Sequence, residues 1–136
     1  MKNITLISRL LISALFLLSA IAKLYPTPLY GITKVFEEGQ LIPMGFSEDF
    51  APFLSRLIIG FEFFIAFAIL QTHYIKKLII PSTILLLIIF NVDLALDIFV
   101  GNDENCGCFG QLIPMTPSEA FIKNIFTILL LFFIYR

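Results

Sequence analysis

The sequence has little charge of either sign. Only 14% of its 136 residues are charged, and 9 Lys and Arg face 10 Asp and Glu, which gives a net charge of −1. No basic cluster is long enough for a nucleic-acid surface or a lipid-headgroup patch. Repeats and low-complexity segments are also absent. These absences exclude a nucleic-acid partner, so we expect the partners of the chain in the membrane or just outside it.

Thiols and imidazoles are equally scarce, with two cysteines and one histidine in the whole chain. Two cysteines are too few for the two-pair relay of quinone-coupled disulfide generators. The histidine, His73, falls in a connection between two apolar segments, on the opposite side from the cysteines. It is therefore discounted as a ligand or base for them.

What the sequence has in excess is apolar residues, at 59% of the chain, with a mean hydropathy of +0.97. Such a composition is typical of an integral membrane protein. The length allows about four membrane-spanning helices and no separate soluble domain. We expect one all-α membrane domain over residues 1–136, a bundle with spans at about 4–24, 53–70, 78–100 and 118–135.

Turn and capping residues set these boundaries. Tyr25-Pro26-Thr27-Pro28 ends the first span, and Thr116-Pro117-Ser118-Glu119 reads as a capping box that opens the fourth. The second span begins between Ser47 and Pro52. The first span also resembles a secretory signal, with a cleavage pattern at Ser19-Ala20-Ile21-Ala22, but its length and the three later spans favour retention. Helical spacing predicts a short helix along the membrane surface from Leu29 to Glu38, with an ordinary connection as the alternative.

Charge asymmetry predicts the orientation of the bundle. Basic residues gather at one end of a four-span model, which should be cytoplasmic: Lys2, Arg9, Lys76, Lys77 and Arg136. The other end receives most of the acidic residues of the connections and the loop of residues 101–116. In a bacterial cytoplasmic membrane this multi-pass topology places both termini inside and the loop outside, where thiols are routinely oxidised.

That loop holds both cysteines, in Cys106-Gly107-Cys108-Phe109-Gly110. A Cys-x-Cys pair closes a disulfide within one tight turn when the middle residue tolerates unusual backbone angles, as Gly107 does. Small rings of this kind are strained and easily reduced, which is typical of catalytic or regulatory disulfides. The alternative is a minor structural disulfide, or two idle thiols.

Several ionisable residues fall inside the spans, where a charge costs on the order of 3 kcal/mol. Cations near the level of the cysteines would lower a thiol pKa and favour the attacking thiolate. The deeper carboxylates suit proton movement or the orientation of a neighbour. Snorkelling anchors and ion pairs that fix the bundle register are the alternatives. The residues are Lys23, Arg56, Glu62, Asp93, Asp97 and Lys123, with Asn91 and Asn124 as interhelical hydrogen-bonding groups.

Taken together, these features resemble the MauE family of methylamine utilisation, within the DoxX-like group of small four-span proteins. The resemblance rests on Ser19-Ala20-Ile21-Ala22-Lys23, on Arg56 with Glu62, on Cys106-Gly107-Cys108-Phe109-Gly110 and on Lys123-Asn124. The family often has Arg-Asn at the last position, and Lys123 lacks the planar fork for bidentate binding. The resemblance implies a role in maturing the disulfide-rich small subunit of methylamine dehydrogenase, with a periplasmic thioredoxin-like partner.

Three functions from different classes remain open. In the first, Cys106 and Cys108 carry out thiol–disulfide exchange, and either a lipid quinone or a second protein regenerates the pair. In the second, Cys106, Cys108 and Met115 bind a soft ion such as Cu(I), although the oxidising compartment opposes this. The third is a non-catalytic assembly factor whose disulfide only shapes the outer loop. The sequence does not decide whether the chain is an enzyme.

Overall fold

A computed structural model of the chain describes residues 2–25, 34–71, 74–110 and 112–136. Within these residues all regular structure is helical, and four segments are long and apolar enough to cross a membrane. They are α1 (Lys2–Lys23), α3 (Ala51–Ala68), α4 (Ile80–Val100) with the preceding π-helical turn η2 (Ile75–Ile79), and α5 (Pro117–Tyr135). The predicted fold class, an all-α bundle of four spans, is confirmed.

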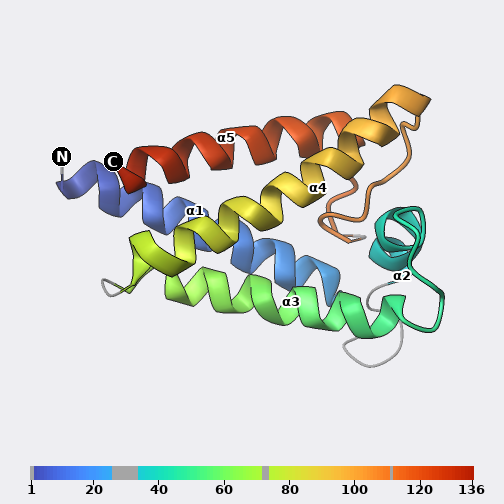
Figure 1. Cartoon of the computed structure of the whole chain (residues 1–136), viewed down its shortest axis with the longest axis horizontal. Helices are drawn as coiled ribbons and strands as arrows, with labels where there is room; N and C mark the ends of the chain where they lie inside the picture. The colour runs from blue at the N-terminus through green and yellow to red at the C-terminus, as the bar shows by residue number, and fades with distance from the viewer. Residues whose placement is uncertain (1, 26–33, 72–73, 111) are drawn as a thin grey trace.

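The four long helices run side by side, with both chain ends at the same end of the bundle (Figure 1). We call this the terminal end. Helix α1 packs mainly on α3, and α4 packs mainly on α5. The opposite end, which we call the loop end, carries the short helix α2 (Lys34–Phe36), the π-helical turn η1 (Glu37–Leu41) and the loop of residues 101–116.

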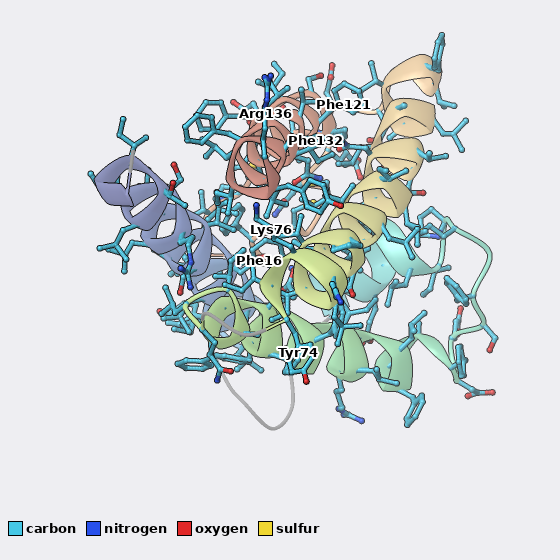
Figure 2. The ribbon with its side chains drawn as sticks, turned by 60° about the vertical axis from the view of Figure 1, so that its left-hand side comes forward. Phe16, Tyr74, Lys76, Phe121, Phe132 and Arg136 are labelled. Atoms are coloured by element: carbon cyan, nitrogen blue, oxygen red, sulfur yellow. The ribbon has the colours of Figure 1, made fainter. Side chains whose placement is uncertain are left out.

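The terminal end has an apolar core that includes Ile12, Ile69 and Leu131, each at most 1% exposed. Polar contacts there involve backbone carbonyls: the Arg9 guanidinium donates to the carbonyl oxygens of Ile69 (2.7 Å) and Gln71 (2.5 Å) at the end of α3. Figure 2 brings this end toward the viewer, with Arg136 at the end of α5. The terminal end is therefore stabilised by apolar packing and by hydrogen bonds to the free carbonyls at the end of α3.

Helix ends follow local sequence signals. Thr116 and Glu119 form the predicted capping box at the start of α5, and Gly101 ends α4 with φ +80°. The helix before α4 starts at Ile75, directly after Tyr74 in a left-handed conformation (φ +57°). Lys76 and Lys77, expected in a polar connection, therefore lie in the helical turn η2.

The predicted surface helix, residues 29–38, lies partly outside the described residues. Its described part forms α2 and η1 and continues to Leu41. Phe36 and Leu41 are each 1% exposed and pack against Ala51 of α3 and Phe90 of α4. The described part of this segment thus packs between α3 and α4 at the loop end.

Candidate functional site

The loop of residues 101–116 folds back into the loop end of the bundle. Cys106 and Cys108 are 2% and 6% exposed, and they pack in one cluster with Ala22 of α1, Leu94 of α4 and Ala120 of α5. Leu94 lies six residues before the end of α4, and at 1.5 Å per residue this is about 9 Å inside the helix. The dithiol therefore lies within the bundle, at the depth of the spans.

Asn105 holds the loop in shape. Its Oδ1 accepts hydrogen bonds from the backbone N–H of Gly107 (3.0 Å) and of Met115 (3.3 Å), and its Nδ2 donates to the carbonyl of Gly110 (3.0 Å). Gly107 has φ +73°, the left-handed region that suits glycine. One amide side chain thus ties together both sides of the turn that carries the cysteines.

Gly110 is placed where no side chain fits. Its φ is +54°, and a Cβ atom there would lie 2.5 Å from the carbonyl oxygen of Ala22 in α1. The neighbouring atom is backbone and has little freedom to move. Gly110 therefore permits the close approach of the loop to α1 on which the burial of the cysteines depends.

Both thiols are free, and they differ in acidity. The Cys108 thiol hydrogen-bonds to the Cys106 sulfur and lowers the pKa of Cys106 to about 7, helped by the Cys108 backbone N–H and by Lys123 and Lys23, against the effect of burial. The Cys108 N–H lies 3.4 Å from that sulfur. The same thiol contact, together with burial, raises the pKa of Cys108. Cys106 is therefore the thiolate of the pair near neutral pH and Cys108 the proton donor.

The loop that carries the cysteines is linked to a buried ion pair between Lys23 of α1 and Glu62 of α3. The Lys23 ammonium, 2% exposed, donates to both carboxylate oxygens of Glu62 (2.8 and 3.0 Å) and to the Ser19 hydroxyl (2.9 Å). The Ser19 oxygen lies 3.0 Å from the carbonyl of Cys108 and 3.2 Å from Glu62 Oε1. Since a hydroxyl has one proton, the shorter contact directs it to the Cys108 carbonyl. The ion pair is thus linked through Ser19 to the backbone of the dithiol.

A second lysine approaches the cysteines from α5. Lys123 Nζ lies 4.4 Å from the centroid of the Phe109 ring, a cation–π contact. Lys123, Asn124, Glu62 and Cys108 also line a small cavity of about 20 Å³, enough for about one water molecule. Two cations and a carboxylate therefore surround Cys108 in a nearly dry site.

The turn η1 covers the dithiol from the other side. Gln40, 1% exposed, has its Oε1 3.8 Å from the Cys108 sulfur, so it is a second acceptor that competes with the Cys106 sulfur for the one proton of the Cys108 thiol. A Cβ atom on Gly39 would lie 3.1 Å from the carbonyl oxygen of Asn105, so the two backbones are nearly in contact. Glu37 is buried as well and accepts a hydrogen bond from Ser55 of α3 (2.8 Å).

The structure brings together most, but not all, of the residues predicted for the site. Lys23, Glu62, Cys108, Lys123 and Asn124 line one small cavity, and Cys106 and Phe109 pack in one cluster with Cys108. Gly107 and Gly110 shape the loop through their positive φ angles. Asp93 is buried one turn before half-buried Asp97 on α4. Arg56 lies on the exposed face of α3 and makes no hydrogen bond or ion pair within the described residues.

Three residues of the site were not predicted: Ser19, Gln40 and Asn105. Asn105 carried a local signal, because asparagine before a glycine-containing turn commonly accepts from the backbone two residues on. Gln40 carried none, since its role comes from contact with a residue 68 positions away. Met115, considered as a metal ligand, packs on the cysteine cluster, and the described residues contain no group of three His, Cys, Asp or Glu that could hold a metal.

Comparisons with known proteins give one family and one relative. The family model described as methylamine utilisation protein MauE matches residues 1–136, the whole chain. Protein TlpB of Flavobacterium psychrophilum is 54% identical over 129 residues, which cover 93% of this chain and 35% of TlpB. The chain thus spans about a third of the length of that curated relative. No solved structure matches.

Proposed function

The chain belongs to the MauE family, and from that premise we propose that it is a membrane thiol–disulfide redox component whose Cys106 and Cys108 exchange electrons with a thioredoxin-like partner. The observation that supports this most strongly is the unequal pair of free thiols, with the pKa of Cys106 lowered to about 7. Disulfide exchange needs a thiolate to attack and an adjacent thiol to resolve the mixed disulfide. Both roles are available within three residues.

The exchange itself requires no metal. The Cys106 thiolate attacks a disulfide of the partner, one partner sulfur leaves as a thiolate, and a mixed disulfide forms. Cys108 then attacks Cys106, the intramolecular disulfide closes, and the second partner sulfur is released with the proton of Cys108. The reverse sequence oxidises the partner. Lys23 and Lys123 stabilise whichever sulfur is anionic.

Access is controlled by η1. Both cysteines are almost fully buried, and Gly39 and Gln40 lie directly against the loop that carries them. A partner cysteine therefore reaches Cys106 only after α2 and η1 move away. This cover slows the reaction of the thiolate with small oxidants while no partner is bound.

The distribution of charge supports a bacterial cytoplasmic membrane with the loop end outside. Arg9, Lys76, Lys77 and Arg136 all lie at the terminal end, and Glu48, Asp49, Asp103 and Glu104 lie at the loop end. A periplasmic thioredoxin-like protein would then approach the dithiol from the loop end, once α2 and η1 have moved away. The final substrate is a disulfide-containing protein, such as methylamine dehydrogenase.

The test is acid trapping of thiols in native membranes with a mass-tagging reagent, for the wild type and for Cys106→Ser and Cys108→Ser. We expect Cys108→Ser to accumulate a mixed disulfide through Cys106, and Cys106→Ser to accumulate much less. A pair that captures nothing in either variant and resists mild reductant would contradict the proposal and favour a non-catalytic assembly factor. Ser118→Ala, an exposed change at the start of α5, is the control.

A further inference from the structure

A groove on the lipid-facing side of α4 lies close to the dithiol. It has a volume of about 390 Å³, within the usual range of small-molecule sites. Its walls are Pro43 and Met44, which follow η1, and four apolar residues of α4 with one acidic residue among them: Ile88, Ile89, Val92, Leu96 and Asp93. Because α4 is a span, this groove opens toward the acyl chains.

Two buried polar atoms beside the groove have no hydrogen-bond partner within the described residues. They are Oδ2 of Asp93, which is 9% exposed, and Nε2 of Gln40. The two side chains are neighbours, and the Gln40 amide interacts with the Asp93 carboxylate without completing a hydrogen bond of ordinary length. A buried polar atom without a full partner costs about 1–3 kcal/mol. Asp93 lines the groove and Gln40 does not, so a ligand in the groove would meet the Asp93 carboxylate first.

The same two residues connect the groove to the cysteines. Gln40 contacts the groove residue Asp93 on one side, and its Oε1 lies 3.8 Å from the Cys108 sulfur on the other. Leu94, next to Asp93 in the sequence, packs in the cluster with Cys106 and Cys108. A head group at Asp93 therefore lies at the depth of the dithiol, separated from Cys108 by Gln40.

We propose that this groove binds a lipid quinone, with its ring between Met44 and Asp93 and its tail in the bilayer. The hydroxyl of the reduced form donates to the carboxylate of Asp93, the polar side chain that lines the groove, and Gln40 lies behind Asp93, toward Cys108. Anionic lipid head groups and fatty acids fit less well, because the Asp93 carboxylate in the groove disfavours a negative charge. The inference rests on the proposed function and names its electron acceptor.

The overall step balances without another reagent. The two thiols of Cys106 and Cys108 lose two electrons and two protons and form one S–S bond. The quinone gains both electrons and both protons and leaves as the hydroquinone. The partner protein then reduces the new disulfide through Cys106. One pair of cysteines is enough for this cycle, because the quinone replaces the second pair of a two-pair relay.

A second lipid-facing groove on the same helix provides an internal control. It is lined by Ile80, Pro81, Ile84, Leu85, Ile88, Phe132 and Tyr135, has about 470 Å³ and contains no charged side chain. Leu85 and Val92 lie seven residues apart on α4 and are 60% and 59% exposed. A tryptophan at either position fills one groove and leaves the bundle interior unchanged.

The test measures binding in the Cys106→Ser/Cys108→Ser variant, so that no thiol chemistry contributes. The probe is an azido-labelled short-tail ubiquinone in nanodiscs, competed with decyl-ubiquinone and read by photo-crosslinking and peptide mapping. We expect Val92→Trp to weaken binding about tenfold or more and Leu85→Trp to leave it unchanged. Equal losses in both variants, or no saturable binding, would overturn the proposal.

Asp93→Asn and Asp97→Asn give a second, independent comparison. Asp93→Asn should weaken binding several-fold, whereas Asp97→Asn, one turn away and outside the groove, should not. The trapping experiment separates the two proposals. A mixed disulfide without quinone binding would remove only the quinone site. Quinone binding with cysteines that capture nothing would leave the groove a ligand site and remove the exchange function.

Discussion

The two ends of the bundle are buried to the same degree but with opposite chemistry. At the terminal end, Ile12, Ile69 and Leu131 are at most 1% exposed, and at the loop end Lys23 and Gln40 are 2% and 1% exposed. Apolar burial of the first kind stabilises a fold directly. Burial of an ion pair is often no better for stability than an apolar pair of the same volume. The comparison indicates that burial at the terminal end stabilises the fold directly, whereas the polar groups buried at the loop end contribute less to stability.

The largest expected effect comes from breaking the charge balance of the loop end. Glu62→Gln leaves the Lys23 ammonium buried without a counter-charge and should cost about 3–5 kcal/mol of unfolding free energy. SDS-titrated unfolding in bicelles measures this. The double variant Lys23→Met/Glu62→Met should recover most of the stability and yet slow thiol exchange. If the double variant is as unstable as Glu62→Gln, the ion pair is structural and the comparison fails.

The next largest effect should come from a substitution in the apolar core of the terminal end, which should change only the stability of the fold. Leu131→Ala opens a cavity in the apolar core and should cost about 2–5 kcal/mol. Leu129→Ala, on the lipid-facing side of the same helix, should change stability by at most about 0.5 kcal/mol. Neither variant should alter the pH dependence of Cys106 alkylation. A shifted profile in Leu131→Ala would show that the two ends are not independent.

A smaller effect is expected where the loop docks on α1. Gly110→Ala forces a Cβ atom against the Ala22 carbonyl as well as straining a positive φ, and should cost about 1–3 kcal/mol. Gly101 also has a positive φ, but a Cβ atom added there meets no other atom within 4 Å. Gly101→Ala should therefore lower the free energy of unfolding by less than Gly110→Ala. Maleimide should label the cysteines faster in Gly110→Ala than in Gly101→Ala. Equal labelling rates would mean that this contact does not hold the loop in place.

The sequence was sufficient for the fold, and it singled out the two cysteines as candidates, because both depend on local signals. Apolar runs, the capping box at Thr116 and the single Cys-x-Cys motif are all read within a few residues. Local signals also identified Lys23 and Glu62 as unusual, since charge inside a span is rare. Their pairing with each other, rather than of Glu62 with Arg56, needed the packing of α1 on α3.

What could not be predicted depends on contacts between distant segments. The sequence did not predict that the loop is buried in the bundle, and this burial follows from Gly110 lying against α1 and Gly39 lying against Asn105. Glu37 is likewise buried and accepts a hydrogen bond from Ser55, which nothing in its local sequence indicated. Neither residue type nor spacing reports such contacts, because they arise only when α2 and η1 insert between the spans.

The most direct test of the account is the pH dependence of Cys106 alkylation by iodoacetamide, read from peptide fragments that separate Cys106 from Cys108. Below the pKa the sulfur is protonated and reacts slowly, and above it the thiolate reacts fast. The account predicts a midpoint near pH 7 in the wild type and a higher midpoint in Cys108→Ala, which lacks the hydrogen bond from the Cys108 thiol. A wild-type midpoint near that of an ordinary thiol, unchanged in Cys108→Ala, would contradict it.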